Sequence, residues 1–171
     1  MALIRTIVVD DSAFVRKVVK EMLSRSPQID VVGLARNGLD ALEMVERLSP
    51  DVVTCDLLMP ELDGVGFVRK QMERKSVPIL ILTASPEDAA HVLDALEAGA
   101  VDFLQKPTAL ANDQLLFIRE ELIGKVKAAA SAHSRSTATL PAPPARVAPA
   151  HSPSGKFDIV VLGISTGGPQ A

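Results

Sequence analysis

The chain has 171 residues, a formal charge of −3 at neutral pH and one cysteine, Cys55. This length suits one full domain and part of another, and the mild negative charge disfavours a polyanion such as DNA as a partner. The lone cysteine excludes an internal disulfide framework, and the lack of a signal peptide or of an apolar run of about 18 residues predicts a cytoplasmic protein with no membrane insertion.

Short apolar runs alternate along the chain with segments of helical periodicity. The expected strands are residues 7–9, 30–35, 51–55, 78–82 and 101–104, and the expected helices are residues 12–26, 39–48, 66–74, 87–98 and a long helix from residue 112 onward. Apolar runs separated by helix-length segments are typical of parallel strands that are buried on both faces. The pattern therefore predicts an α/β fold with a five-stranded, doubly wound parallel sheet.

The composition changes near residue 129. Residues 131–155 are rich in alanine, serine, threonine and proline and hold almost no large apolar residues, so they cannot bury enough surface to offset the entropy of ordering. We expect a folded domain over residues 1–128 and a disordered linker over residues 129–155. Residues 156–171 would be the first strand of a second α/β domain, truncated after Ala171.

Five polar side chains follow four of the expected strands. They are Asp10, Asp11, Asp56, Thr83 and Lys106. Ligands of open α/β sheets bind just beyond the carboxyl ends of the strands, so we expect these side chains to converge on one crevice. Three carboxylates need a cation beside them, and Mg²⁺ fits best because it accepts one or two carboxylates, several waters and a phosphate oxygen. A phosphoryl group on Asp56 would then face Mg²⁺ and Lys106, with the Thr83 hydroxyl within reach.

Simpler interpretations of single residues stay open. Asp11 and Ser12 can simply cap the first expected helix, and Lys106 before a proline is an ordinary loop residue. Cys55 favours a buried strand position over a role as nucleophile. The three histidines are expected to be exposed to solvent rather than to act as catalytic bases: His91, His133 and His151.

Several motifs around these side chains carry a resemblance to a known family. They are Val9–Ser12, Asp56–Pro60 with Asp63–Gly64, Leu82–Ala84, Gly99–Phe103 and Lys106–Pro107. With them, the chain from Ile4 to about Lys127 closely resembles the receiver domain of two-component response regulators, which has a flavodoxin-like fold. The resemblance implies that Asp56 accepts a phosphoryl group from a histidine kinase.

The same resemblance implies further roles. Asp10 and Asp11 would bind Mg²⁺ together with Asp56 and the backbone carbonyl of Leu58. Thr83 and Lys106 would be switch residues, and Phe103 would be the switch aromatic residue that turns inward when Thr83 moves. As an alternative, Phe103 is simply a core residue.

The segment 163–167 follows an apolar strand and has the pattern G-x-S-x-G, which resembles a nucleophile turn that exposes a serine. Alone, such a loop is equally compatible with a simple turn or a phosphate-binding loop. After a receiver domain and a linker, residues 162–169 resemble the chemotaxis protein-glutamate methylesterase family. The resemblance implies that Ser165 is the nucleophile of a Ser-His-Asp triad. The family's histidine and aspartate would lie beyond Ala171, so we expect the chain by itself to have no esterase activity.

The methylesterase resemblance implies a regulatory function. Phosphorylation of Asp56 by a chemotaxis histidine kinase would relieve a block that the receiver face imposes on the protein's own esterase domain. That domain would hydrolyse glutamate methyl esters on methylated chemoreceptors and deamidate some glutamines.

Alternative functions are a stand-alone response regulator that acts through protein contacts and a Mg²⁺-dependent phosphohydrolase with an aspartate nucleophile. The second is disfavoured because Asp10-Asp11-Ser12 does not match the D-x-D pattern of enzymes that resemble dehalogenases. A DNA-binding regulator is disfavoured because no basic stretch or helix-turn-helix pattern follows the linker.

Overall fold

The structure is a computed structural model that describes residues 3–106 and 112–138. The chain divides into two units, residues 1–139 and residues 140–171, and the described residues all belong to the first. Ser165, His151 and the predicted second domain lie outside the described residues.

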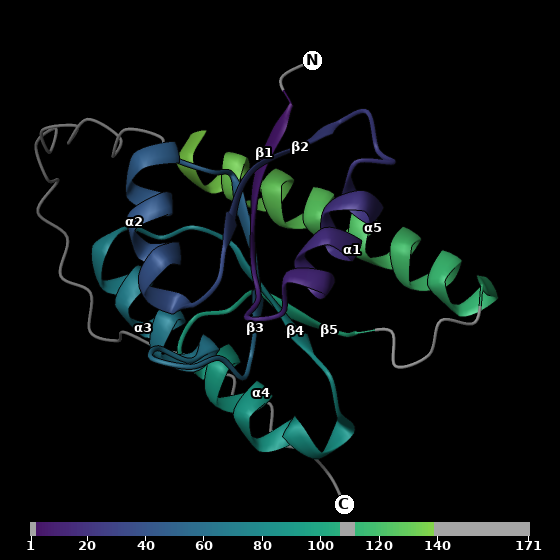
Figure 1. The fold of residues 1–171 in the computed structure, drawn as a ribbon. Helices are drawn as coiled ribbons and strands as arrows, with labels where there is room; N and C mark the ends of the chain where they lie inside the picture. Colours follow the sequence, from purple (N-terminus) through teal and green to yellow (C-terminus); the bar gives the residue numbers. More distant parts are fainter. Residues whose placement is uncertain (1–2, 107–111, 139–171) are drawn as a thin grey trace, which may run out of the picture. The chain divides into compact units, whose positions relative to one another are not determined.

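Five parallel strands form one sheet in the order β2-β1-β3-β4-β5 (Figure 1). The strands are β1 (Ile4–Val9), β2 (Ile29–Ala35), β3 (Val52–Asp56), β4 (Ile79–Thr83) and β5 (Asp102–Gln105). The helices are α1 (Ala13–Leu23), α2 (Gly38–Leu48), α3 (Gly64–Arg74), the short 3₁₀ helix η1 (Pro86–Asp88), α4 (Ala89–Glu97) and α5 (Asn112–Ala138). The predicted fold class, a doubly wound parallel sheet, is confirmed.

Helices cover both faces of the sheet because its strands are apolar on both sides. Alternate side chains of β1 enter two different cores: Ile7 and Val9 pack with residues of α2, α3 and α4, whereas Val8 packs with residues of α1 and α5. Figure 1 shows α2, α3 and α4 on one face and α1 and α5 on the other. The strand sequences are thus continuously apolar because each strand is buried on both faces of the sheet, as expected for parallel strands.

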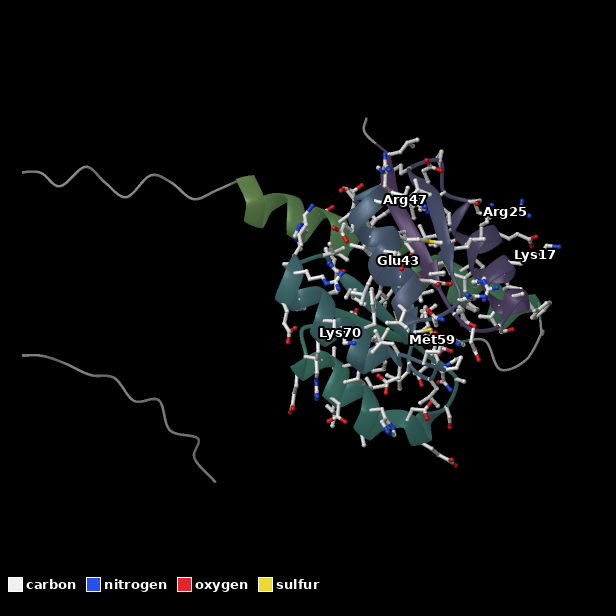
Figure 2. All side chains as sticks on the ribbon, turned by 60° about the vertical axis from the view of Figure 1, so that its left-hand side comes forward. Lys17, Arg25, Glu43, Arg47, Met59 and Lys70 are labelled. Carbon is white, nitrogen blue, oxygen red and sulfur yellow. The ribbon has the colours of Figure 1, made fainter. Side chains whose placement is uncertain are left out.

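The outer faces of the helices are charged. Lys17, Arg25, Glu43, Arg47 and Lys70 are exposed and project away from the sheet, from α1 and the turn after it, from α2 and from α3 (Figure 2). Among the residues that the structure describes, no helix combines the length and the apolar character that a membrane crossing requires.

Helix ends near the carboxyl edge of the sheet are fixed by side-chain caps. The Ser12 hydroxyl accepts a hydrogen bond from the backbone N–H of Val15 at 3.4 Å, so Ser12 is the N-cap of α1, as the simpler interpretation of this residue predicted. Asp63 caps α3 in the same way through the N–H of Gly66, at 2.7 Å.

The end of α5 differs from the predicted domain boundary. We expected the linker to begin at residue 129, but α5 continues to Ala138. The low content of large apolar residues indicated disorder, yet alanine has the highest intrinsic helix propensity. Ala130 is also buried in the core that α5 shares with α1. Residues 129–138 are therefore helical, and the prediction that this part is disordered was wrong.

The chain connections diverge at the carboxyl ends of β1 and β3. These strands are neighbours in the sheet, but the chain leaves β1 for α1 on one face and leaves β3 for α3 on the other (Figure 1). The point where the connections diverge in this way is the position at which open α/β sheets bind their ligands.

Candidate functional site

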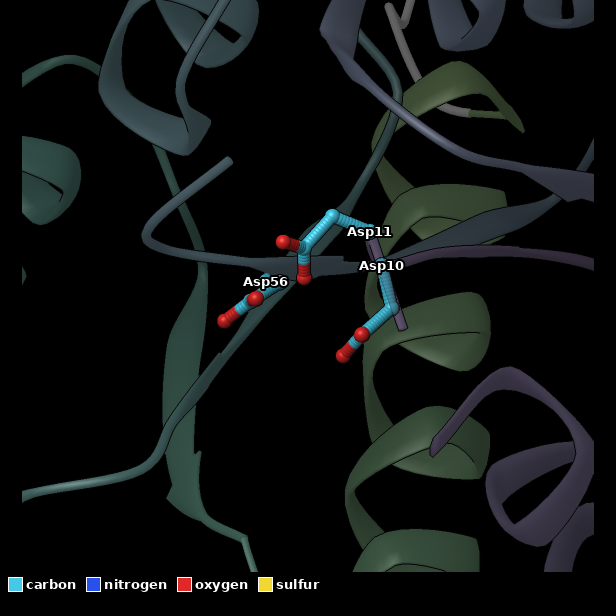
Figure 3. Close-up of side chains that lie close together, drawn as sticks. All are labelled: Asp10, Asp11 and Asp56. Carbon is cyan, nitrogen blue, oxygen red and sulfur yellow. The ribbon is translucent and has the colours of Figure 1, made fainter. Parts of the chain in front are cut away.

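Three carboxylates gather at this edge of the sheet. Asp10 directly follows β1, Asp11 comes next, and Asp56 is the last residue of β3. Because Val9 pairs with Cys55 in the β1–β3 register, Asp10 and Asp56 fall side by side. Oxygen atoms of the three carboxylates lie within 4.8 Å of one another (Figure 3). Asp10 and Asp56 are buried and Asp11 is exposed, so the cluster has one side open to solvent.

The ammonium group of Lys106 joins two of these carboxylates. Its Nζ donates to Asp10 Oδ2 at 2.6 Å and lies 2.7 Å from Asp56 Oδ1. A backbone hydrogen bond of 2.7 Å from Lys106 N–H to the Thr83 carbonyl fixes the end of β5 against β4. The structure thus brings Asp10, Asp11, Asp56 and Lys106 close together, as predicted.

One ammonium group is paired with two buried carboxylates. Burial and hydrogen bonding at this site shift the pKa values of Asp56 and Lys106. Burial raises the pKa of Asp56 above its usual range, and the hydrogen bond from Lys106 offsets this only in part. For Lys106, burial acts to lower the pKa, but the hydrogen bonds to Asp10 and Asp56 outweigh it, so the pKa is raised. The site therefore keeps an excess of negative charge when its carboxylates are ionised.

Asp10 is held by two groups from α1 and its cap. The backbone N–H of Ser12 donates to Asp10 Oδ1 at 2.9 Å, and the Arg16 guanidinium donates from Nη1 to the Asp10 carbonyl at 2.5 Å. Sequence reasoning missed Arg16, because no motif links a helical arginine to a strand end six positions earlier. Only the direction in which α1 leaves β1 brings the two together.

Thr83 lies where predicted, buried at the end of β4, but its hydroxyl has other partners. It donates to Asp88 Oδ2 at 2.8 Å and lies 3.2 Å from the Ser85 carbonyl oxygen. Sequence reasoning also missed Asp88. A signal was present, because Ser85-Pro86-Glu87-Asp88 has the spacing of a capping box, and the structure contains that capping box at η1.

Phe103 and Leu58 both expose their side chains. Phe103 on β5 is 44% exposed, so the alternative that it is simply a core residue is wrong. Leu58 lies in the loop after β3, and its side chain is 53% exposed. The role of its carbonyl as a metal ligand remains a prediction.

Cys55, His91 and His133 take no part in the carboxylate cluster. Cys55 is fully buried and burial raises the pKa of its thiol, so the prediction of a buried strand residue is confirmed. His91 is exposed as predicted, whereas His133 is half-buried on α5, which contradicts the predicted exposure. The prediction failed because α5 extends past residue 128.

The donor set fits Mg²⁺. Hard divalent cations prefer oxygen ligands, and Mg²⁺ uses one or two carboxylates while it retains several waters. Asp10, Asp11 and Asp56 supply such oxygens within 4.8 Å of one another, and the exposed Asp11 leaves room for water. A cation here would offset the excess negative charge and would leave Asp56 beside both a positive ion and the ammonium of Lys106.

Comparisons with known proteins agree with this fold. Residues 6–116 match the model of the response regulator receiver domain. The chain superposes on the response regulator domain of Thermotoga maritima CheB with a TM-score of 0.68 and 37% identity, covering 75% of this chain and 97% of that one.

Curated relatives extend the similarity along almost the whole chain. The chain is 47% identical over 170 residues to the Myxococcus xanthus protein-glutamate methylesterase/protein-glutamine glutaminase 5, covering 98% of this chain and 49% of the relative. It is 43% identical over 182 residues to the protein-glutamate methylesterase/protein-glutamine glutaminase of Symbiobacterium thermophilum, covering 98% of this chain and 50% of that relative. It thus spans about half the length of these relatives. Since the receiver model matches more than half of its residues, the chain belongs to the response regulator receiver domain family.

Proposed function

We propose that this chain is the phosphorylation-dependent regulatory part of a chemotaxis protein-glutamate methylesterase/protein-glutamine glutaminase. The observation that carries the proposal is the surroundings of Asp56. This carboxylate is buried, lies within 4.8 Å of the Asp10 and Asp11 carboxylates and is 2.7 Å from the Lys106 ammonium. Such a site can receive a phosphoryl group, because phosphoryl transfer depends mainly on positioning and charge neutralisation.

In the proposed reaction, a carboxylate oxygen of Asp56 attacks the phosphorus of a phosphohistidine on a chemotaxis histidine kinase. The bond between phosphorus and the histidine nitrogen breaks, its electron pair stays on that nitrogen, and Asp56 becomes an acyl phosphate. Lys106 stays paired with the developing negative charge on the phosphoryl oxygens. Mg²⁺ held by Asp10, Asp11, Asp56 and the Leu58 carbonyl would supply the remaining charge neutralisation.

We propose that the switch acts through Thr83, Lys106 and Phe103. On phosphorylation, the Thr83 hydroxyl would turn to a phosphoryl oxygen. Thr83 and Phe103 line one apolar groove of 340 Å³ between α4 and β5. In our proposal, a movement of Thr83 would open space there for the Phe103 ring. Leu93 on the same groove is 60% exposed. This face would contact the esterase domain of the same protein, and phosphorylation would release that contact.

The esterase part of the proposal rests on the relatives. Their similarity covers 98% of the chain, well past the receiver match that ends at residue 116. This extent favours a methylesterase over the alternative, a stand-alone response regulator. In our proposal Ser165 is the nucleophile, methylated glutamates of chemoreceptors are the substrates, glutamines are deamidated, and the protein works in the cytoplasm.

Acetyl phosphate with Mg²⁺ tests the phosphorylation site. We expect intact-mass spectrometry to find one added phosphoryl group on the chain and none on the Asp56→Asn variant. Asp30→Asn, which changes an exposed aspartate on β2, is the matched control and should be labelled like the wild type. A label that persists in Asp56→Asn would overturn the assignment.

The esterase role needs a separate test in the full-length gene product. We expect methanol release from methylated chemoreceptors to rise when Asp56 is phosphorylated and to vanish in Ser165→Ala. A Ser165→Ala variant that keeps its activity would exclude this serine as the nucleophile. A product that is phosphorylated but releases no methanol would favour the stand-alone regulator.

A further inference from the structure

The hydroxyl of Thr83 is tied to the segment that begins α4. It donates to Asp88 Oδ2 at 2.8 Å, and the same carboxylate oxygen accepts the backbone N–H of Ser85 at 3.2 Å. Ser85 in turn caps η1, because its hydroxyl accepts the N–H of Glu87 at 3.1 Å. The Asp88 carboxylate is therefore held in place by the backbone and is not a mobile surface group.

We propose that Asp88 is a positioning residue that retains the Thr83 hydroxyl on the α4 side in the unphosphorylated protein and thereby opposes the phosphorylation switch. This inference rests on the proposed function of Asp56. It assigns a role to a residue outside the cluster of Asp10, Asp11, Asp56 and Lys106.

The proposed role of Asp88 depends on competition for the single hydroxyl hydrogen of Thr83. A threonine hydroxyl has a single hydrogen to donate. Asp88 and a phosphoryl group on Asp56 are both anionic acceptors, which form stronger hydrogen bonds than neutral ones. The hydroxyl can satisfy only one of them at a time, so the bond to Asp88 has to be given up before Thr83 can serve the phosphoryl group.

Thermodynamic linkage predicts how the bond between Thr83 and Asp88 affects the affinity for a phosphoryl analogue at Asp56. A contact made only in the free state lowers the affinity of every ligand that requires the other state. One net hydrogen bond corresponds to about a fivefold change in an equilibrium constant. Removal of the Asp88 carboxylate is therefore expected to tighten the binding of a phosphoryl analogue at Asp56 by about fivefold.

Beryllofluoride with Mg²⁺ serves as that analogue, and ¹⁹F NMR or calorimetry measures its affinity. We expect Asp88→Ala to bind it about fivefold more tightly than the wild type. We expect Asp88→Asn to lie between the two, since its amide oxygen still accepts hydrogen bonds but carries no charge. Asp94→Ala removes an exposed carboxylate of the same helix and should behave like the wild type.

A double-mutant cycle separates this role from a merely structural one. Thr83→Val removes the donor hydroxyl but leaves the bond between Asp88 and Ser85 intact. If Asp88 acts through Thr83, Asp88→Ala should change the affinity no further in the Thr83→Val background. An equal effect in both backgrounds would mean that the loss of the cap, not the release of Thr83, is responsible, and would overturn the inference.

The outcomes also separate this inference from the proposed function. If the wild type binds beryllofluoride and Asp56→Asn does not, the proposed site stands. Unchanged affinity in Asp88→Ala then overturns only the role of Asp88. If the wild type itself fails to bind, the proposed site and the inference fall together.

Discussion

Asp10 and Asp56 share a single ammonium group, that of Lys106, which lies 2.6 Å from the first carboxylate and 2.7 Å from the second. The two aspartates come from neighbouring strands and the lysine from the end of a third, so the sheet register sets the contact. Any cation that binds Asp10 and Asp56 meets this ammonium at close range. Lys106 therefore stabilises the cation-free site and repels the cation that we expect there.

The first prediction concerns this competition. Lys106→Met removes a positive charge close to the cation site, so we expect Mg²⁺ to bind about tenfold more tightly. Two unit charges about 4 Å apart in a partly buried site repel each other by about 4 kcal/mol. A tenfold change in affinity corresponds to about 1.4 kcal/mol, which is only part of that repulsion. Calorimetry measures it, because the chain has no tryptophan or tyrosine for fluorescence. Lys70→Met on α3 removes an exposed charge (Figure 2) and should leave the affinity unchanged. Weaker binding in Lys106→Met would contradict the proposed competition.

The second prediction concerns pH. Burial raises the pKa of Asp56 above its ordinary value of 3.8, so the folded chain binds this proton more tightly than the unfolded chain does. The free energy of unfolding therefore falls as pH rises from about 3.8 through the raised pKa. Without Mg²⁺, Asp56→Asn should then be more stable than the wild type at pH 7, and this advantage should shrink toward pH 4.

Denaturation in EDTA, followed by circular dichroism at several pH values, measures that difference. Lys106 stays protonated across this range because its own pKa is raised, so it contributes no pH dependence there. Asp30→Asn changes an exposed carboxylate and should give little pH-dependent difference. A difference between Asp56→Asn and the wild type that stays constant with pH would show that desolvation of Asp56 does not act as inferred.

Much of the site was predictable because it depends on periodicity and topology. Continuous apolar runs indicate parallel strands, and the residues after parallel strands meet at one edge. On this basis the sequence alone predicts that Asp10, Asp11, Asp56 and Lys106 lie close together. No contact between side chains was needed for that step, since the strand ends fix the backbone positions.

The features of the site and fold that the sequence did not predict depend on which of several nearby groups a side chain or segment contacts. The position of Thr83 follows from β4, but its hydroxyl can turn to either side, and the nearby carboxylate of Asp88 decides the direction. Arg16 reaches the Asp10 carbonyl only because of the angle at which α1 leaves the sheet. At residue 129 helix propensity and core contacts prevailed over the disorder that the composition had indicated.

The third prediction compares two glycines. A Cβ at Gly64 would collide with the Asp56 carbonyl oxygen and lie 2.9 Å from Leu57 Cα, so Gly64→Ala has to displace the backbone that carries Asp56. We expect a loss of about 1–3 kcal/mol in the free energy of unfolding, together with slower phosphorylation by acetyl phosphate.

Gly124 lies within α5 and a Cβ there meets nothing within 4 Å. Gly124→Ala should therefore stabilise the chain by about 0.5–1 kcal/mol. Equal effects at the two positions would contradict the close approach at Gly64.

The last prediction tests the extended α5. Ala130 lies past the boundary that the sequence indicated, yet it is helical and 7% exposed. Ala130→Gly should cost about 1 kcal/mol of helix propensity and nearly as much again for the lost methyl burial. Ala128→Gly, at an exposed position of the same helix, should cost the propensity alone. Chemical denaturation followed by circular dichroism gives both values. If Ala130→Gly is as stable as the wild type, residues 129–138 do not contribute to the fold, and the domain ends where the composition alone would place it.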